Sequence, residues 1–256
     1  MSFILISFKN SLIYRSSILF NILGSIIRVL ISIALWSFLY VDNIEMINYM
    51  IIYTIMSNII SLFYSGGMSD AIGSKVISGS FAIDLIRPTN FIKMNYFQLI
   101  GKMLSSFVLK GLPTIFLFLP LLILNSHFNR PIYIILAFIA IMCGHCLCMI
   151  IYSCIGFLAF VLLEIWPINM FMEDTIKFFS GALIPIALFP GWLSAIVEVM
   201  PFRFLYSFPL QLMINNLSSS YIFASFIVLF VWIILLGLLL LFSYKKAINK
   251  CIVQGG

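Results

Sequence analysis

Long uninterrupted runs of apolar residues restrict the fold of this chain more than any other feature of its sequence. Each run has about the 20 residues that a helix needs to cross the hydrocarbon core of a bilayer. Hydrophobic residues make up 63% of the 256-residue chain and charged residues only 9%, and the lack of alternation argues against a transmembrane barrel. Because a backbone in lipid must satisfy its own hydrogen bonds, we expect an all-α polytopic membrane protein. The six expected transmembrane helices cover residues 17–40, 46–66, 98–124, 131–163, 168–189 and 221–243.

The basic residues collect on one side of these expected spans. On the opposite side the connecting segments hold only Arg130 and Arg203. Since cytoplasmic loops carry an excess of lysine and arginine, we expect both termini in the cytoplasm. The net charge of +6 then reflects topology and attraction to membrane lipid, and no nucleic-acid partner is expected. The basic side holds Lys9, Arg15, Lys75, Arg87, Lys93, Lys177, Lys245, Lys246 and Lys250.

The N-terminal segment, residues 1–16, mixes apolar residues with Lys9 and Arg15. This composition predicts an amphipathic helix that lies on the inner leaflet. The first span is too long for the apolar region of a cleavable signal peptide. We therefore expect an interfacial helix over 1–16, followed by a transmembrane domain over 17–256.

The segment 67–95, between the second and third spans, is longer than a simple connection needs to be. Met68, Ile72 and Val76 recur at a spacing of four residues, with polar residues between them. This spacing predicts a short amphipathic helix. Gly79 allows that helix to stop.

The second half of this segment, "GSFAIDLIRP" (residues 79–88), carries an apolar ridge of Phe81, Leu85 and Ile86. Asp84 and Arg87 are three residues apart and would share one helical face, while Pro88 forces a turn. A cytoplasmic segment with its own apolar ridge indicates docking on another protein.

Charged residues inside or beside the expected spans are rare, and they are the second candidate site. They are Arg28, Lys110, Glu173, Asp174 and Lys177. Glu173 and Lys177 are four residues apart and can pair on one helical face. Two interpretations stay open: these side chains line a translocation path or gate, or they fix helix packing and extend toward the interface.

Prolines interrupt the apolar segment 181–217. A fifth span that ends near Phe189, followed by short re-entrant helices over 190–217 at the outer leaflet, fits this pattern. An ordinary apolar external loop is the alternative. The prolines are Pro185, Pro190, Pro201 and Pro209.

The motif "CGHCLC" (residues 143–148) resembles a redox tetrapeptide, but it lies inside an apolar run. A redox cysteine pair needs a thioredoxin-like context with solvent access. We therefore interpret Cys143, Cys146 and Cys148 as packing residues, Gly144 as a point of close helix contact, and His145 as a donor or acceptor to a neighbouring helix. No metal site is expected.

Catalytic signatures are missing from the sequence. It holds no P-loop and no HExxH or GxSxG motif, so no catalytic residue is assigned and no cofactor is expected on this chain. A transport subunit is a better interpretation than an enzyme.

Three stretches resemble one family. "GSFAIDLIRP" (79–88) is similar to the coupling segment of ABC-2 type ATP-binding-cassette exporter permeases. "SGALIPIALFPGWLSAIVEVMPF" (180–202) resembles the fifth span and re-entrant helices of that family, and "INKCIVQGG" (248–256) resembles the tail of one subgroup. The resemblance extends over nearly the whole chain.

The resemblance implies a type V exporter-like fold and a defined set of partners. Two permease subunits, identical or paralogous, would pack around a shared path in the bacterial cytoplasmic membrane. Each would dock a separate ATPase subunit that binds ATP and magnesium. The cargo would be amphipathic: a drug, an antimicrobial peptide or a lipid. The implied ATPase-coupling residues are Gly79, Phe81, Asp84, Leu85, Ile86, Arg87 and Pro88.

Two other functions stay open at this point. An ion- or proton-coupled secondary transporter could use Glu173 and Asp174 as a relay, although no internal repeat supports the inverted-repeat architecture of such proteins. A membrane-embedded thiol enzyme built on Cys143 and Cys146 is the least supported interpretation.

Overall fold

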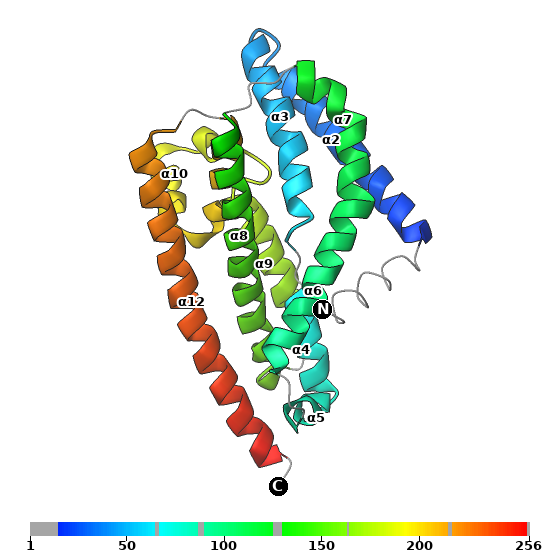
Figure 1. Cartoon of the computed structure of the whole chain (residues 1–256), viewed down its shortest axis with the longest axis vertical. Helices are drawn as coiled ribbons and strands as arrows, with labels where there is room; N and C mark the ends of the chain where they lie inside the picture. The colour runs from blue at the N-terminus through cyan, green and yellow to red at the C-terminus, as the bar shows by residue number, and fades with distance from the viewer. Residues whose placement is uncertain are drawn as a thin grey trace.

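The computed structural model describes residues 15–64, 67–86, 90–124, 130–162, 164–214 and 217–254. Within these ranges the chain is helical and has no strand (Figure 1). The all-α prediction is therefore confirmed. The interfacial helix predicted over 1–16 falls almost entirely outside the described residues, and so do Arg87 and Pro88.

Within the described residues, five helical stretches are long and apolar enough to cross a membrane. They coincide largely with α2 (Arg15–Leu39), α3 (Ile44–Ser61), α6 and α7 (Phe91–Ser106 and Leu112–Leu124), α8 (Pro131–Phe157) and α12 (Ser219–Gln254).

A π-helical turn, η1 (Phe107–Gly111), joins α6 to α7 within one continuous stretch. Pro113 follows this turn and has no N–H to donate to the carbonyl of Leu109, which favours a local change in the hydrogen-bond pattern. The N–H of Leu112 instead bonds to the carbonyl of Phe107.

The fifth expected span, 168–189, is shorter in the structure. Helix α9 (Trp166–Phe179) has 14 residues, which is about 21 Å of helix against a hydrocarbon core of about 30 Å. The chain turns after it at Gly181, whose φ of +81° suits a residue without a side chain. The prediction of six full spans is therefore not confirmed.

Short helices follow α9. They are the 3-10 turns η3 (Ile186–Leu188) and η4 (Pro201–Phe204), α10 (Gly191–Val199) and α11 (Ser207–Ile214). Pro190, Pro201 and Pro209 lie at or near the first residues of three of them, where a missing N–H costs least. Their predicted depth in the membrane stays a prediction.

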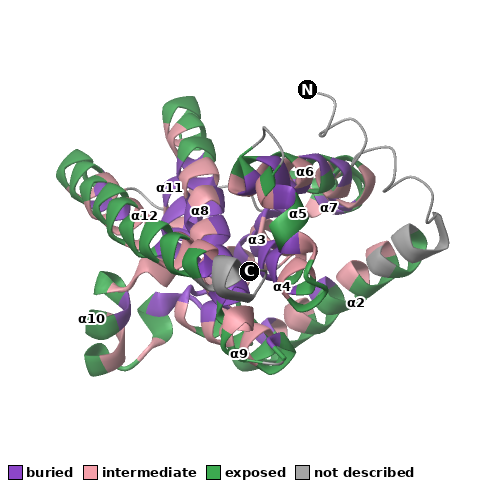
Figure 2. Ribbon diagram, turned by 90° about the horizontal axis from the view of Figure 1, so that it is seen from below, coloured by how far each residue is buried: buried purple, intermediate pink, exposed green. Residues whose placement is uncertain are grey.

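Helix α8 is the centre of the molecule and packs against α4 (Gly67–Ile77), α11 and α12. Figure 2 shows buried residues along α8 and α3, and exposed residues on the outer faces of α2 and α12. The exposed residues of α2 and α12 are largely leucine, isoleucine and phenylalanine, as expected for helices that face lipid.

Candidate functional site: a coupling segment and a polar cleft

Helices α4 (Gly67–Ile77) and α5 (Ser80–Ile86) form one end of the molecule, near the C-terminal end of α12 (Figure 1). Met68 and Ile72 are buried on the face of α4 that packs against α8, and Gly79 ends the helix with a φ of +74°. Helix α4 therefore has a buried apolar face, and the chain turns at Gly79 just after its end. The contact with α8 is very close, because a Cβ on Gly156 would come within 3.1 Å of the Ser69 backbone.

Phe81 differs from its expected role. Its side chain is 1% exposed and is surrounded by Phe91, Phe157 and Phe160, with ring centroids 4.8, 6.2 and 5.4 Å away. An apolar ring in this position anchors α5 to the ends of α6 and α8. The expectation that Phe81 enters a groove on a partner is therefore wrong.

Asp84 is also directed inward. Its carboxylate is buried and lies 2.8 Å from Lys75 Nζ, which in turn donates a hydrogen bond of 3.1 Å to Asn95 Oδ1. The same ammonium lies 4.9 Å from the centre of the Phe91 ring. This network ties α5 to α4 and α6, so Asp84 does not occupy the exposed rim position expected for it.

The exposed surface of α4 and α5 is also apolar, but residues other than Phe81 form it. Ile86 is 85% exposed, and Ile77 and Ile83 are each 60% exposed. Leu85 is partly buried against the core. The segment 67–86, the candidate coupling segment, therefore presents isoleucines outward and is held in place by Phe81 and the Lys75–Asp84 pair.

A polar cleft lies between α2, α3, α8 and α9. It consists of two cavities of about 110 and 330 Å³ that share four lining residues. Ser57 and Asn58 of α3 line the smaller cavity, and Tyr64, Tyr152 and Glu173 line the larger one. We call both together the polar cleft; the shared residues are Arg28, Ser61, Lys177 and Tyr206.

The structure brings three of the five predicted path residues together in this cleft. Arg28, Glu173 and Lys177 line it, and Lys177 Nζ lies 2.7 Å from a Glu173 carboxylate oxygen. This confirms the pairing expected from their spacing. Asp174 is more exposed and lies 3.8 Å from the same ammonium. Lys110 lies in the η1 turn and does not line the cleft.

Backbone carbonyls after α9 are held by side chains of α3. Tyr53 donates its hydroxyl proton to the carbonyl of Gly181, and Ser57 Oγ donates to the carbonyl of Ala182 at 2.8 Å. The N–H of Ser207 bonds to the carbonyl of Ser180 at 2.9 Å. The carbonyl groups at and beyond the C-terminal end of α9 thereby have hydrogen-bond partners, and these bonds hold the segment beside the cleft in place.

Sequence reasoning missed several residues of the cleft. The hydroxyl groups of Tyr64, Tyr152 and Tyr206 come from three separate segments, so no local pattern connects them. Asn169 does not line the cleft, but the sequence contains a signal for it, because it precedes Glu173 and Lys177 at the same four-residue spacing. It bonds to Asp70 and thereby links α9 to α4.

The cysteine motif packs inside α8, as expected. Cys148 is buried, and a Cβ on Gly144 would come within 2.8 Å of the Tyr64 hydroxyl oxygen. A ring nitrogen of His145 lies 2.6 Å from the carbonyl of Phe63, beyond the end of α3. Among the described residues, no group of three or more His, Cys, Asp or Glu could hold a metal.

Comparison with known proteins identifies a family. A family model described as "ABC-2 family transporter protein" matches residues 36–255. This range contains the coupling segment and all of the polar cleft except the residues from α2 that precede it. No curated protein and no solved structure matches the chain.

Proposed function

Because the chain belongs to the ABC-2 family of transporter proteins, we propose that it is the membrane subunit of an exporter driven by a separate ATPase. The ATPase, which carries ATP and magnesium, docks on the exposed faces of α4 and α5. A second permease subunit, identical or paralogous, packs across the polar cleft and completes the path.

The observation that carries this proposal is the position of the cleft. Arg28 belongs to a helix that is long and apolar enough to cross the membrane, and Glu173 and Lys177 are 58% and 40% exposed beside it. Charged groups at membrane depth are costly when they face lipid. A second subunit across this surface removes them from lipid and encloses a polar path between the two copies.

Cargo of amphipathic character fits the cleft. Tyrosine rings and Ile176 provide apolar contacts, while Arg28, Glu173 and Lys177 provide charge. A drug, a small antimicrobial peptide or a lipid combines both kinds of surface.

The distribution of charge supports one orientation. The end with α4, α5 and the end of α12 carries Lys75, Lys93, Lys245 and Lys246, so it faces the cytoplasm of a bacterial cell. A cysteine introduced at Glu198 should then react with an impermeant maleimide from outside the cell. Reaction from the cytoplasmic side alone would reverse this orientation.

Reconstitution tests the proposal as a whole. The protein, co-expressed with its ATPase, should retain that ATPase through purification and export a fluorescent amphipathic dye only with ATP. Export that persists in ATP-depleted vesicles with an ion gradient would support ion-coupled transport instead.

A further inference from the structure

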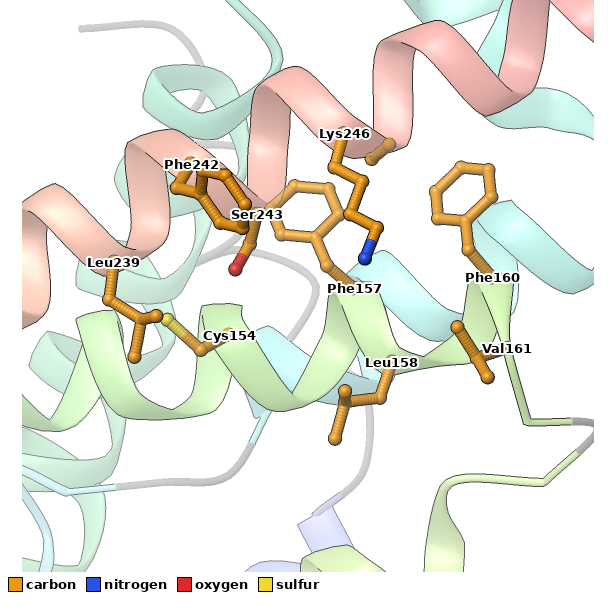
Figure 3. A pocket seen from close by; sticks show the side chains of 10 residues that line it. Cys154, Phe157, Leu158, Phe160, Val161, Leu239, Phe242, Ser243 and Lys246 are labelled. Carbon is orange, nitrogen blue, oxygen red and sulfur yellow. The ribbon is translucent and has the colours of Figure 1, made fainter.

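A groove between the last turns of α8 and the C-terminal half of α12 is separate from the polar cleft. It has a volume of about 180 Å³. Figure 3 shows Leu239, Phe242, Ser243 and Lys246 on the α12 side of the groove, opposite Cys154 and Phe157 of α8. The Lys246 ammonium reaches across the groove toward the opposite wall (Figure 3).

The lining of the groove is apolar except at two places. Ser243 and Lys246 provide the polar side-chain atoms, and among the residues that the structure describes no carboxylate lines the groove. Leu239 and Phe242 are 50% and 65% exposed at its side. Because α8 and α12 are both candidate membrane spans, this open side faces acyl chains while Lys246 marks the level of the headgroups.

From this arrangement we propose that the groove binds one anionic phospholipid. The phosphate pairs with the Lys246 ammonium and accepts a hydrogen bond from Ser243 Oγ. One acyl chain follows Leu239, Phe242 and Leu158. A lysine in an apolar groove without a carboxylate partner is complementary to an anionic headgroup with an attached chain.

The wall of the groove connects this lipid to the coupling segment. Phe157 and Phe160 line the groove and also contact the Phe81 ring that anchors α5. Tyr244 of α12 packs on Phe157 with centroids 5.7 Å apart. A bound lipid therefore supports the aromatic cluster from its outer side, a consequence that rests on the function proposed above.

Lipid retention tests the binding site without any ATPase. The purified chain is placed in nanodiscs of phosphatidylcholine and phosphatidylglycerol, re-extracted, and its bound lipids are counted by native mass spectrometry. Wild type should retain phosphatidylglycerol preferentially, and Lys246→Gln should lower that preference about fivefold, the ratio for about 1 kcal/mol per basic residue. Lys246→Arg should restore it.

Two variants separate the groove from general surface charge. Lys245→Gln removes an exposed lysine next in sequence that does not line the groove, and it should leave retention unchanged. Leu239→Trp fills the groove and should reduce retention with Lys246 intact. Equal losses in the Lys245 and Lys246 variants, or normal retention in Leu239→Trp with an unchanged melting temperature, would overturn the site.

A second measurement tests the link to coupling. In the reconstituted complex, ATP hydrolysis should be higher in phosphatidylglycerol than in phosphatidylcholine, and Lys246→Gln should remove this difference. If lipid retention is normal but the lipid has no effect on ATP hydrolysis, the groove binds lipid but does not influence coupling. A complex without ATPase would instead reject the function proposed above while the lipid site stands.

Discussion

Asn169 Nδ2 donates a hydrogen bond of 2.9 Å to Asp70 Oδ1, which joins the start of α9 to α4. Asn169, Glu173 and Lys177 follow at four-residue intervals and share one face of α9. One polar face therefore extends from the helix proposed to meet the ATPase to the polar cleft. We infer that a displacement of α4 reaches the cleft through α9.

Breaking this bond should uncouple hydrolysis from transport. Asp70→Ala and Asn169→Ala are each expected to lower the ratio of dye export to ATP hydrolysis by about two- to tenfold, as for loss of one hydrogen bond. The ATPase should stay bound to the Asn169→Ala variant, because Asn169 belongs to α9 and not to the proposed docking helices α4 and α5.

A double-mutant cycle decides whether the two residues act together. The double variant should be no worse than either single variant, whereas fully additive losses would mean that the bond transmits nothing. Ser74→Ala is the matched control, since Ser74 lies on α4 and its hydroxyl bonds to the carbonyls of Asp70 and Ala71 in the same helix.

Phe81→Ala should lower the stability of the folded protein itself. Removing a ring that is 1% exposed is expected to cost about 3–5 kcal/mol, measured by thermal unfolding in detergent. Ile83→Ala removes an exposed side chain of the same helix, and its unfolding midpoint should match wild type. Similar midpoints for both variants would argue against an anchoring role for Phe81.

Gly156→Ala should push α4 away from α8. The new Cβ would lie 2.8 Å from Ile72 Cβ and 3.1 Å from the Ser69 backbone, an overlap that is expected to cost about 1–3 kcal/mol. Gly237→Ala on α12 has no atom within 4 Å of its Cβ and should be neutral or slightly stabilising. If both variants unfold together, the close contact of α4 with α8 is not present in the membrane.

The charges of the polar cleft should act as a pair. Glu173→Lys and Lys177→Glu are each expected to lower export, and the combined swap should restore much of it because the 2.7 Å ion pair can re-form. Asp174→Asn should have a smaller effect, since Asp174 lies farther from Lys177. If the double variant is as inactive as either single variant, Glu173 and Lys177 do not act as a pair in transport.

For Arg28 we expect no rescue by a second substitution in the export assay, in contrast to Glu173 and Lys177. Among the described residues the structure pairs Glu173 with Lys177 and gives Arg28 no ion pair. Arg28→Leu should therefore lower export, and adding Glu173→Leu should not rescue it. Recovery in that double variant would show that Arg28 and Glu173 become partners in another state.

Several local features could be predicted from the sequence because they depend on short-range spacing. The buried face of Met68 and Ile72, the helix stop at Gly79 and the Glu173–Lys177 pair all follow from periodicity or backbone freedom. The direction of Phe81 could not be predicted in this way. Phe81, Ile83 and Ile86 are all apolar, and only the position of Phe157 and Phe160 decides which of them is buried.

The length of α9 and the composition of the cleft depend on tertiary structure. The stretch 168–189 is predicted as one span, but Gly181 adopts a positive φ, and Tyr53 and Ser57 hydrogen-bond the carbonyls of Gly181 and Ala182. The cleft collects side chains from α2, α3, α8 and α9. These side chains come together only through the packing of the helices, so the sequence of any single segment does not predict the cleft.

The most direct test of the central claim is whether the exposed isoleucines hold the ATPase. Ile83→Asp with Ile86→Asp should fold with a wild-type unfolding midpoint, because both side chains are at least 60% exposed. The ATPase should no longer co-purify, and dye-stimulated hydrolysis in proteoliposomes should fall to background, since charge is placed in a desolvated contact. Co-purification and hydrolysis at wild-type levels in this folded variant would contradict docking through α4 and α5.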